Sequence, residues 1–274
     1  MPTIPDGTFA AVLGSPIAHS LSPTLHLAAY AELGLDWKYE KYEVLETELK
    51  DFLAELSGDC RGLSLTMPLK AQAFHLAEST DTAASKTRAC NTLIRSTSGW
   101  TGYNTDVPGF VRALESRDVS VGNRATIIGA GATARSAIAA LSTMGVTQFD
   151  VLARRVEQVR ELAGLFQEVA VLPHAMDGQW PANRLLVSTL PSGALEKPLL
   201  SDACEIVFDV VYAPWPTALA EASADRVVLS GLDLLVHQAA VQVHLMTGCS
   251  PESAPVIIQA MYSAGLAEQA RRSE

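Results

Sequence analysis

The sequence predicts an α/β protein with two domains, and three observations support this class. Short apolar runs alternate with amphipathic stretches, as expected of parallel strands joined by helices. A new series of strand, loop and helix begins near residue 124. The chain of 274 residues, 48% of them hydrophobic, is long enough for two domains that each bury a core.

The elements of the first half follow from local patterns. Strands are expected at 8–15, 37–44 and 60–68, where apolar or alternating runs end at turn residues or at proline. A serine, a following proline and a closing glycine predict a helix over 22–34, with Ser22 as its cap. The other expected elements are helices over 46–58 and about 69–84 and a hairpin over 89–106 that turns at 97–99.

The second half reads as a nucleotide-binding unit followed by two helices. A helix is expected over 106–119. The remaining elements are strands or strand-like runs at 148–155, 169–173, 184–193, 204–214 and 227–231, and helices at 154–166, 231–248 and 255–269. We expect the last two helices to pack back on the first domain. The predicted domains are therefore 1–105 with 237–274, and 106–236.

Composition and charge exclude several classes of protein. A net charge of −10 without a basic block argues against nucleic acid or an anionic membrane as partner. No apolar run is long enough for a membrane span, and the N-terminal pattern is not that of a signal peptide, so a cytoplasmic location is expected. The cysteines and histidines lack metal-ligand spacing, which predicts reduced thiols and no metal site.

A glycine-rich loop marks the second domain. The segment GAGATA at 129–134 lies between an expected strand and an expected helix, which is the context of a dinucleotide fingerprint. Gly129 permits the tight turn, Gly131 allows close approach of a pyrophosphate, and Ala134 takes the third position. The alternative is a tight turn with a structural role only. The predicted cofactor-binding residues of this loop are Gly129, Ala130, Gly131, Ala132, Thr133 and Ala134.

Two arginines follow the next expected strand, where NAD-binding sites have a carboxylate. Asp150 lies too early in that strand to take this part. Guanidinium groups match a 2′-phosphate, so Arg154 and Arg155 favour NADP(H) as cofactor. The alternative is a solvated helix start, although a helix N-terminus disfavours two cations.

Polar residues cluster after the strands of the first domain. Ser20 and Ser22 lie in a strand-to-helix loop, and Thr66 and Lys70 follow another strand. Taken singly, a serine there is a helix cap and a lysine is surface. The set is completed by Asn91, Asn104, Thr105 and Asp106.

Seven motifs in the same order make the chain resemble the shikimate dehydrogenase family: GSPIAHSLSPTLH, LTMPLKA, ACNTL, GYNTDVPGF, GAGATARSA, DVVYAPWPT and GLDLLVHQAA. The resemblance implies an N-terminal substrate domain and a Rossmann-like NADP domain. It implies that Ser20 and Ser22 hold the substrate carboxylate. Its further implied substrate-binding residues are Thr66, Lys70, Asn91, Asp106, Tyr212 and Gln238.

The implied reaction is the reversible reduction of 3-dehydroshikimate to shikimate by NADPH. Lys70 and Asp106 inherit the catalytic roles, since an ammonium beside the reacting oxygen can deliver a proton and stabilise charge. Further residues expected at the cofactor are Thr189, Val210 and Gly231, with ordinary core or turn roles as the alternative for the last two. The family usually has Asn-Arg-Thr at the positions that are Ala153, Arg154 and Arg155 in this chain. Arg154 matches the family, whereas the contacts of the Asn and the Thr are lost at Ala153 and Arg155.

Three rival interpretations stay open. The first is a quinate/shikimate dehydrogenase that uses NAD; by resemblance, the paired serines in the first loop favour shikimate over quinate, and the arginines favour NADP. A non-catalytic ligand sensor on the same fold would lack the lysine or the aspartate, and both are present. A methylenetetrahydrofolate dehydrogenase does not fit the serine loop. The expected partner is a small-molecule substrate, and either a monomer or a homodimer is expected.

Overall fold

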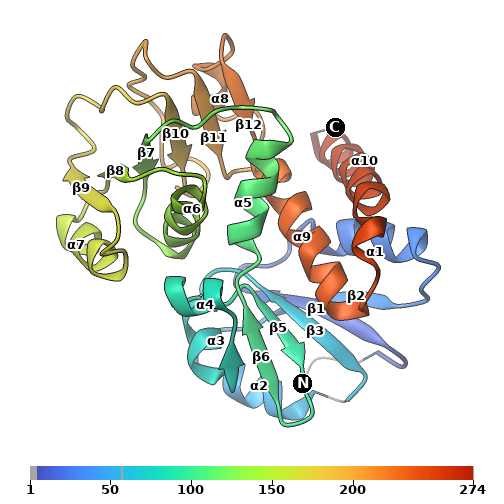
Figure 1. The fold of residues 1–274 in the computed structure, drawn as a ribbon. Helices are drawn as coiled ribbons and strands as arrows, with labels where there is room; N and C mark the ends of the chain where they lie inside the picture. Colours follow the sequence, from blue (N-terminus) through green and yellow to red (C-terminus); the bar gives the residue numbers. More distant parts are fainter. Residues whose placement is uncertain (1–4, 57, 274) are drawn as a thin grey trace. The chain divides into compact units, whose positions relative to one another are not determined.

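The computed structural model describes residues 5–56 and 58–273, and the chain divides into two compact units (Figure 1). Unit 1 comprises Met1–Thr105 and Leu235–Glu274, and unit 2 comprises Asp106–Leu234. The second boundary falls two residues before the predicted one. It lies inside the continuous helix α9 (Gly231–Thr247), so no break in the chain marks it.

Unit 1 contains a six-stranded mixed sheet in the order β2-β1-β3-β5-β6-β4. Its strands are β1 (Phe9–Gly14), β2 (Lys38–Glu43), β3 (Cys60–Leu65), β4 (Ser79–Thr80), β5 (Thr92–Arg95) and β6 (Trp100–Tyr103). The first three are mutually parallel, whereas β5 runs antiparallel to β3 and β6. The hairpin predicted around 97–99 is confirmed, because Arg95 pairs with Trp100.

Helices cover both faces of this sheet, and alternate strand residues face different helices. Leu63 and Leu65 of β3 join a core with residues of α2 (Leu49–Glu55), α3 (Lys70–Leu76) and α4 (Thr82–Thr87). The residues that alternate with them, Gly62 and Ser64, face α9. A Cβ at Gly62 would lie 2.8 Å from Met246, and the Ser64 hydroxyl donates to Gln242. On this side α1 (Ser22–Glu32) packs against α10 (Ala254–Ser273), which follows a short 3-10 helix at Pro251–Ser253.

The helix expected over about 69–84 is wrong as one element. The helix α3 ends at Leu76, and the chain then forms the edge strand β4, which pairs with β6. Asp81 accepts a hydrogen bond from the Ala84 N–H at 2.6 Å and starts α4. The break follows from sheet pairing and a new N-cap. The helix expected at 46–58 is shorter, and residue 57 lies outside the described residues.

Ser22 is not the cap of α1, contrary to expectation. The helix begins at Ser22 itself, and its N-cap residue Leu21 contributes no side-chain bond. Instead the Ser20 Oγ accepts a hydrogen bond from the Ser22 N–H at 3.2 Å. The Ser22 side chain is therefore not used to cap the first turn.

Unit 2 contains a six-stranded parallel sheet in the order β12-β11-β10-β7-β8-β9. Its strands are β7 (Arg124–Ile128), β8 (Gln148–Leu152), β9 (Ala170–His174), β10 (Leu185–Ser188), β11 (Ile206–Asp209) and β12 (Val227–Leu229). Numbered within the unit, this is the strand order 3-2-1-4-5-6 of a doubly wound dinucleotide-binding fold. The order reverses between β7 and β10, where such folds bind their ligands.

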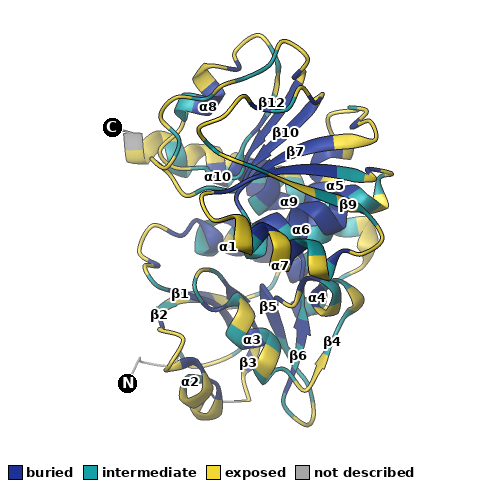
Figure 2. Cartoon of the chain, turned by 90° about the vertical axis from the view of Figure 1, so that its left-hand side faces the viewer, coloured by how far each residue is buried: buried dark blue, intermediate teal, exposed yellow. Residues whose placement is uncertain are grey.

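The central strands of unit 2 are buried on both faces, and Figure 2 shows them in dark blue. Ile127 and Val187 pack with α5 (Asp106–Glu115), α6 (Ala132–Thr143) and α7 (Val156–Leu165). The next residue of β7, Ile128, packs on the other face with Trp180 and with Leu219 of α8 (Ala218–Glu221). The strand expected over 204–214 is shorter and ends at Asp209. After one more backbone bond to β10, from the Val210 N–H to the Ser188 carbonyl, the Asp209 carboxylate accepts from the Val211 N–H and the Thr217 hydroxyl and turns the chain away.

The free energy of unfolding is expected to fall by about 3 kcal/mol between pH 7 and pH 4 because of His26. This side chain in α1 is fully buried and stacks on Tyr39 at 4.0 Å. Burial lowers its pKa from 6.5 to about 4, although hydrogen bonds with Ser22 and Gln242 raise it in part. The unfolded chain therefore binds the proton first as pH falls below 6.5, and stability is lost until pH 4.

Urea unfolding at several pH values measures this dependence, and His26→Phe is the matched variant because it keeps an aromatic ring against Tyr39. The variant should lose less stability between pH 7 and pH 4 than the wild type. Parallel pH profiles of the two proteins would contradict the assignment.

Candidate functional site

Four strands of unit 1 bring polar residues to one edge of its sheet. The parallel strands β1 and β3 end at this edge, and β6 ends there too. The antiparallel strand β5 begins at the same edge, since Thr92 pairs with both Ser64 and Tyr103. The residues that follow or precede these strand ends are those that the sequence singled out.

Two buried serines lie where the loop after β1 meets α1: Ser20 is in the loop, and Ser22 is the first residue of the helix. Ser20 is 8% exposed and Ser22 is 5% exposed. The loop is anchored from two other elements: Lys41 Nζ donates to the Ala18 carbonyl at 2.7 Å, and Arg272 Nη1 donates to the His19 carbonyl at 2.7 Å. The positions of both hydroxyls are thus set by the fold of unit 1.

The segment after β3 carries Thr66 and Lys70. The Thr66 N–H donates to the Leu13 carbonyl at 2.9 Å, which continues the pairing with β1. Lys70 is the first residue of α3 and is half-buried. Its carbonyl accepts a hydrogen bond from the Cys90 N–H at 2.9 Å. Lys70 is therefore tied to the residue directly before Asn91.

Asn91, Thr105 and Gln238 form a buried cluster. The Asn91 Oδ1 accepts from the Thr105 N–H at 2.8 Å, and its Nδ2 donates to the Thr105 Oγ1 at 3.0 Å. The Asn91 Nδ2 also lies 3.3 Å from the Gln238 Oε1, to which the Thr105 hydroxyl is 3.1 Å. All three are under 7% exposed. Asp106 follows Thr105 directly, begins α5 and is 5% exposed.

The loop after β7 has the conformation that its glycines allow. Gly129 has φ +105°, and a Cβ there would lie 2.4 Å from the Thr189 hydroxyl. Thr189 follows β10, the neighbour of β7, and its hydroxyl donates to the Ile128 carbonyl at 2.9 Å. Over Gly131, by contrast, the space is open for 4 Å. Packing within the chain therefore explains Gly129, whereas no neighbouring atom requires a glycine at position 131.

Helix α6 starts directly at this loop. Its N-cap residue is Gly131, which provides no side-chain cap, and Ala132, Thr133 and Ala134 form the first turn. The N–H groups of a first helical turn attract anions when no side chain occupies them.

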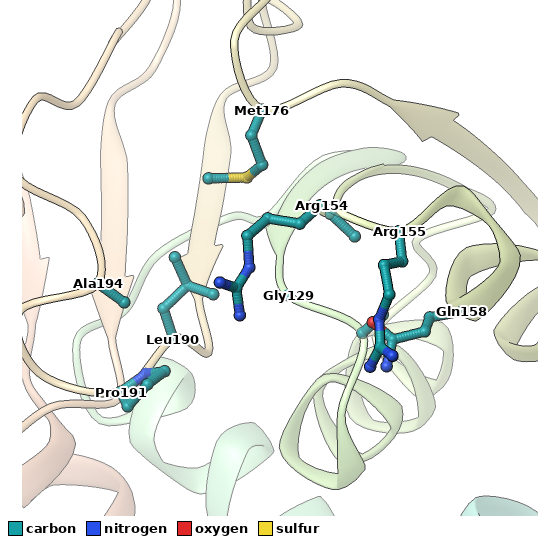
Figure 3. A pocket seen from close by; sticks show the side chains of 10 residues that line it. Gly129, Arg154, Arg155, Gln158, Met176, Leu190, Pro191 and Ala194 are labelled. Atoms are coloured by element: carbon teal, nitrogen blue, oxygen red, sulfur yellow. The ribbon is translucent and has the colours of Figure 1, made fainter.

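The two arginines after β8 line a pocket of about 510 Å³ together with Gly129 and Ala130 (Figure 3). Both are exposed, and within the described residues neither forms a salt bridge. In Figure 3 the Arg154 side chain reaches toward Leu190, while Arg155 runs beside Gln158. Two positively charged side chains therefore line the same pocket.

Asp150 is engaged elsewhere, as its early place in the strand suggested. It is 1% exposed and accepts hydrogen bonds from Asn183 and His174, both at 2.7 Å, and from Arg124 at 3.2 Å. Burial would raise its pKa, but these three partners together lower the pKa below its usual value. The carboxylate is thus unavailable to a ribose.

The segment after β11 carries Val210 and Tyr212, both half-buried. The buried Asp209 holds this segment, since its carboxylate accepts from the Val211 N–H at 3.3 Å and from the Thr217 hydroxyl at 2.7 Å. Gly231, which begins α9, packs on it so closely that a Cβ would lie 2.1 Å from the Val210 carbonyl oxygen. This close backbone packing explains why residue 231 is a glycine.

The structure divides the predicted residues between its units. Unit 1 contains the residues predicted to bind the substrate, except for Asp106 and Tyr212, which belong to unit 2. Unit 2 also contains all the residues predicted to bind the cofactor. The sequence analysis missed several residues that line the arginine pocket. Gln158 had a local signal, since it lies three residues after Arg155 on α7. The others come from distant loops and had none: Met176, Leu190, Pro191 and Ala194.

Two features are absent from the described residues, 5–56 and 58–273. No helix there is both long and apolar enough to cross a membrane. No group of three or more histidine, cysteine, aspartate or glutamate side chains in this part of the chain could hold a metal ion.

Two family models match the chain. The model described as "Shikimate dehydrogenase substrate binding domain" matches residues 12–93 of unit 1. The model described as "Shikimate / quinate 5-dehydrogenase" matches residues 113–179 of unit 2.

Known proteins are similar over most of the chain. The shikimate dehydrogenase (NADP(+)) of Anaeromyxobacter sp. strain K is 34% identical over 253 residues, 86% of this chain and 90% of that one. The crystal structure of the Mycobacterium tuberculosis shikimate dehydrogenase has 37% identity and a TM-score of 0.82, covering 95% and 99% of the two chains. That of Thermus thermophilus shikimate 5-dehydrogenase, in complex with NADP(H) and shikimate, has 32% identity and a TM-score of 0.80, covering 94% and 99%.

Proposed function

Because this chain belongs to the shikimate dehydrogenase family and is an NADP-dependent oxidoreductase of that family, we propose that Lys70 and Asp106 carry its reversible reduction of 3-dehydroshikimate to shikimate. One observation supports the assignment above the others. The Asn91 cluster joins both residues, since Cys90 bonds to the Lys70 carbonyl and Asp106 follows Thr105.

The polar edge of unit 1 suits a small carboxylate that carries several hydroxyl groups. The buried hydroxyls of Ser20 and Ser22 bind the substrate carboxylate. Amide and hydroxyl groups donate to and accept from ring hydroxyls, as buried polar sites require. Thr66, Asn91, Gln238 and Tyr212 have this role, whereas the Lys70 ammonium only donates and the Asp106 carboxylate only accepts.

Lys70 supplies the proton that the reaction needs. The cofactor supplies hydride chemistry when it is bound. The Lys70 ammonium donates a proton to the oxygen of the reacting carbonyl and stabilises negative charge there. The Asp106 carboxylate orients Lys70 and accepts a hydrogen bond from a substrate hydroxyl.

The residues of unit 2 fit NADP(H). The open space over Gly131 and the uncapped start of α6 suit a pyrophosphate, whose charge the first-turn N–H groups favour. Arg154 and Arg155 bind the 2′-phosphate through charge-assisted hydrogen bonds. No carboxylate lines the pocket to repel this phosphate, since Asp150 is bound to Asn183 instead. The rest of the cofactor site is formed by Ala130, Ala132, Thr133, Ala134, Thr189, Val210 and Gly231.

Oxidation of shikimate and of quinate, each with NADP+ and with NAD+, tests the proposed function. We expect the largest kcat/KM with shikimate and NADP+. A larger value with NAD+ and quinate would instead support a quinate/shikimate dehydrogenase. Absence of activity in all four combinations, together with binding of shikimate, would support a ligand sensor.

A further inference from the structure

We infer that Gln242 is a positioning residue for the substrate: it orients the Asn91 amide through Thr92, behind the residues that bind the ligand. The inference rests on the proposed function, in which Asn91 binds shikimate. Gln242 lies one turn after Gln238 on α9, so the two side chains share a face of that helix. Gln242 is 1% exposed.

Gln242 receives a hydrogen bond from the sheet of unit 1. The Tyr39 hydroxyl of β2 donates to the Ser64 Oγ of β3 at 2.6 Å. The Ser64 hydroxyl in turn donates to the Gln242 Oε1 at 2.7 Å. Tyr39 is 4% exposed and Ser64 is 5% exposed. The oxygen end of the Gln242 amide is thereby directed to β3.

The nitrogen end of the same amide is directed to β5. The Gln242 Nε2 donates to the Thr92 Oγ1 at 2.8 Å and lies 3.3 Å from the Asn91 carbonyl oxygen. The Thr92 hydroxyl has one proton, and it donates this proton to the Asn91 Oδ1 at 2.9 Å. Gln242 donates to this hydroxyl, and of the two acceptors around the Thr92 proton the Asn91 Oδ1 at 2.9 Å is nearer than the Thr105 Oγ1 at 3.3 Å.

The result is a series of donations with one direction, from Tyr39 to Asn91. It leaves the Asn91 Oδ1 facing donors and the Nδ2 facing Thr105 and Gln238. Hydrogen bonds in such a series strengthen one another when buried. A side-chain amide binds a ring hydroxyl either through its oxygen or through its nitrogen. The orientation of the Asn91 amide therefore decides whether the substrate hydroxyl contacts Oδ1 or Nδ2.

Packing of α9 on the sheet does not require these polar groups. Met246, one turn further along α9, lies so close to Gly62 of β3 that a Cβ there would be 2.8 Å from the Met246 Cγ, so apolar packing also joins this helix to the sheet. A buried polar network costs desolvation, and apolar groups of similar size often replace such groups without loss of stability. The network is therefore best explained by what it orients.

Steady-state kinetics of the full chain test the inference. Gln242→Leu and Thr92→Val should each raise the KM for shikimate about fivefold, the effect of one lost hydrogen bond. The kcat and the KM for NADP+ should stay within about twofold. Since both residues act on the same atom of Asn91, the double variant should resemble the stronger single variant rather than the product of the two.

Val243→Ala is the matched control, because Val243 is fully buried on the same helix and carries no polar side-chain group. It should lower the melting temperature and leave the KM for shikimate unchanged. If this control raises the KM for shikimate equally, or if the effects multiply in the double variant, Gln242 has only a structural role and the inference is wrong. If Gln242→Leu does not fold, Thr92→Val decides alone: an unchanged KM overturns the inference.

Asn91→Ala separates the inference from its premise. A rise of about tenfold or more in the KM for shikimate, with no effect of Gln242→Leu, keeps the proposed site and overturns the role of Gln242. An unchanged KM in Asn91→Ala removes Asn91 from the substrate site and overturns both.

Discussion

Replacing Lys70 by alanine should lower kcat for shikimate oxidation at least about 100-fold, with only a modest change in the KM for shikimate. General acid–base catalysis contributes on the order of 100- to 10,000-fold, and Lys70 is the ammonium that the proposed site provides. Its backbone is held by the Cys90 N–H, so the loss of the side chain should leave α3 in place.

Two further variants serve as a control and a refinement of this prediction. Lys50→Ala removes an exposed lysine from α2 of the same unit and should leave kcat unchanged. Lys70→Arg keeps the charge but releases a proton far less readily, so it separates proton delivery from electrostatic stabilisation. Turnover by Lys70→Ala within about threefold of wild type would remove Lys70 from the chemistry.

Replacing Arg154 by alanine should raise the KM for NADP+ about 10- to 100-fold, and Arg155→Ala should raise it less. Each guanidinium that meets a phosphate makes a charge-assisted hydrogen bond worth about 1.5–3 kcal/mol. Both side chains are exposed, so the penalty should shrink at high salt. The KM for NAD+, which has no 2′-phosphate, should change little in either variant.

Arg160→Ala is the control for this pair. Arg160 lies on α7 with 73% of its side chain exposed, and its partner is Glu157. Its loss changes the net charge equally without touching the pocket. If Arg154→Ala and Arg155→Ala leave the KM for NADP+ at the value of this control, the arginines are merely the solvated start of α7.

Much of the fold could be predicted because its signals are local. The glycine loop, its strand and its helix lie within about 20 residues, and the hairpin around 97–99 has its turn residues in sequence. The order of strands in unit 2 also agrees with the fold that the loop predicts. Errors occurred where a distant partner decides the local structure, as at β4, which exists because β6 pairs with it.

For the site, the sequence by itself determined the chemical groups: the serine loop, Lys70 and Asp106, and a pair of arginines in place of an acid. Only the tertiary structure decided which buried side chains surround these groups and what they bind. It engaged Asp150 with His174 and Asn183, and it joined Ser64 to Gln242 across 178 residues. Hydrogen bonds between such distant residues leave no periodic or spaced pattern in the chain, because the fold alone brings the partners within reach.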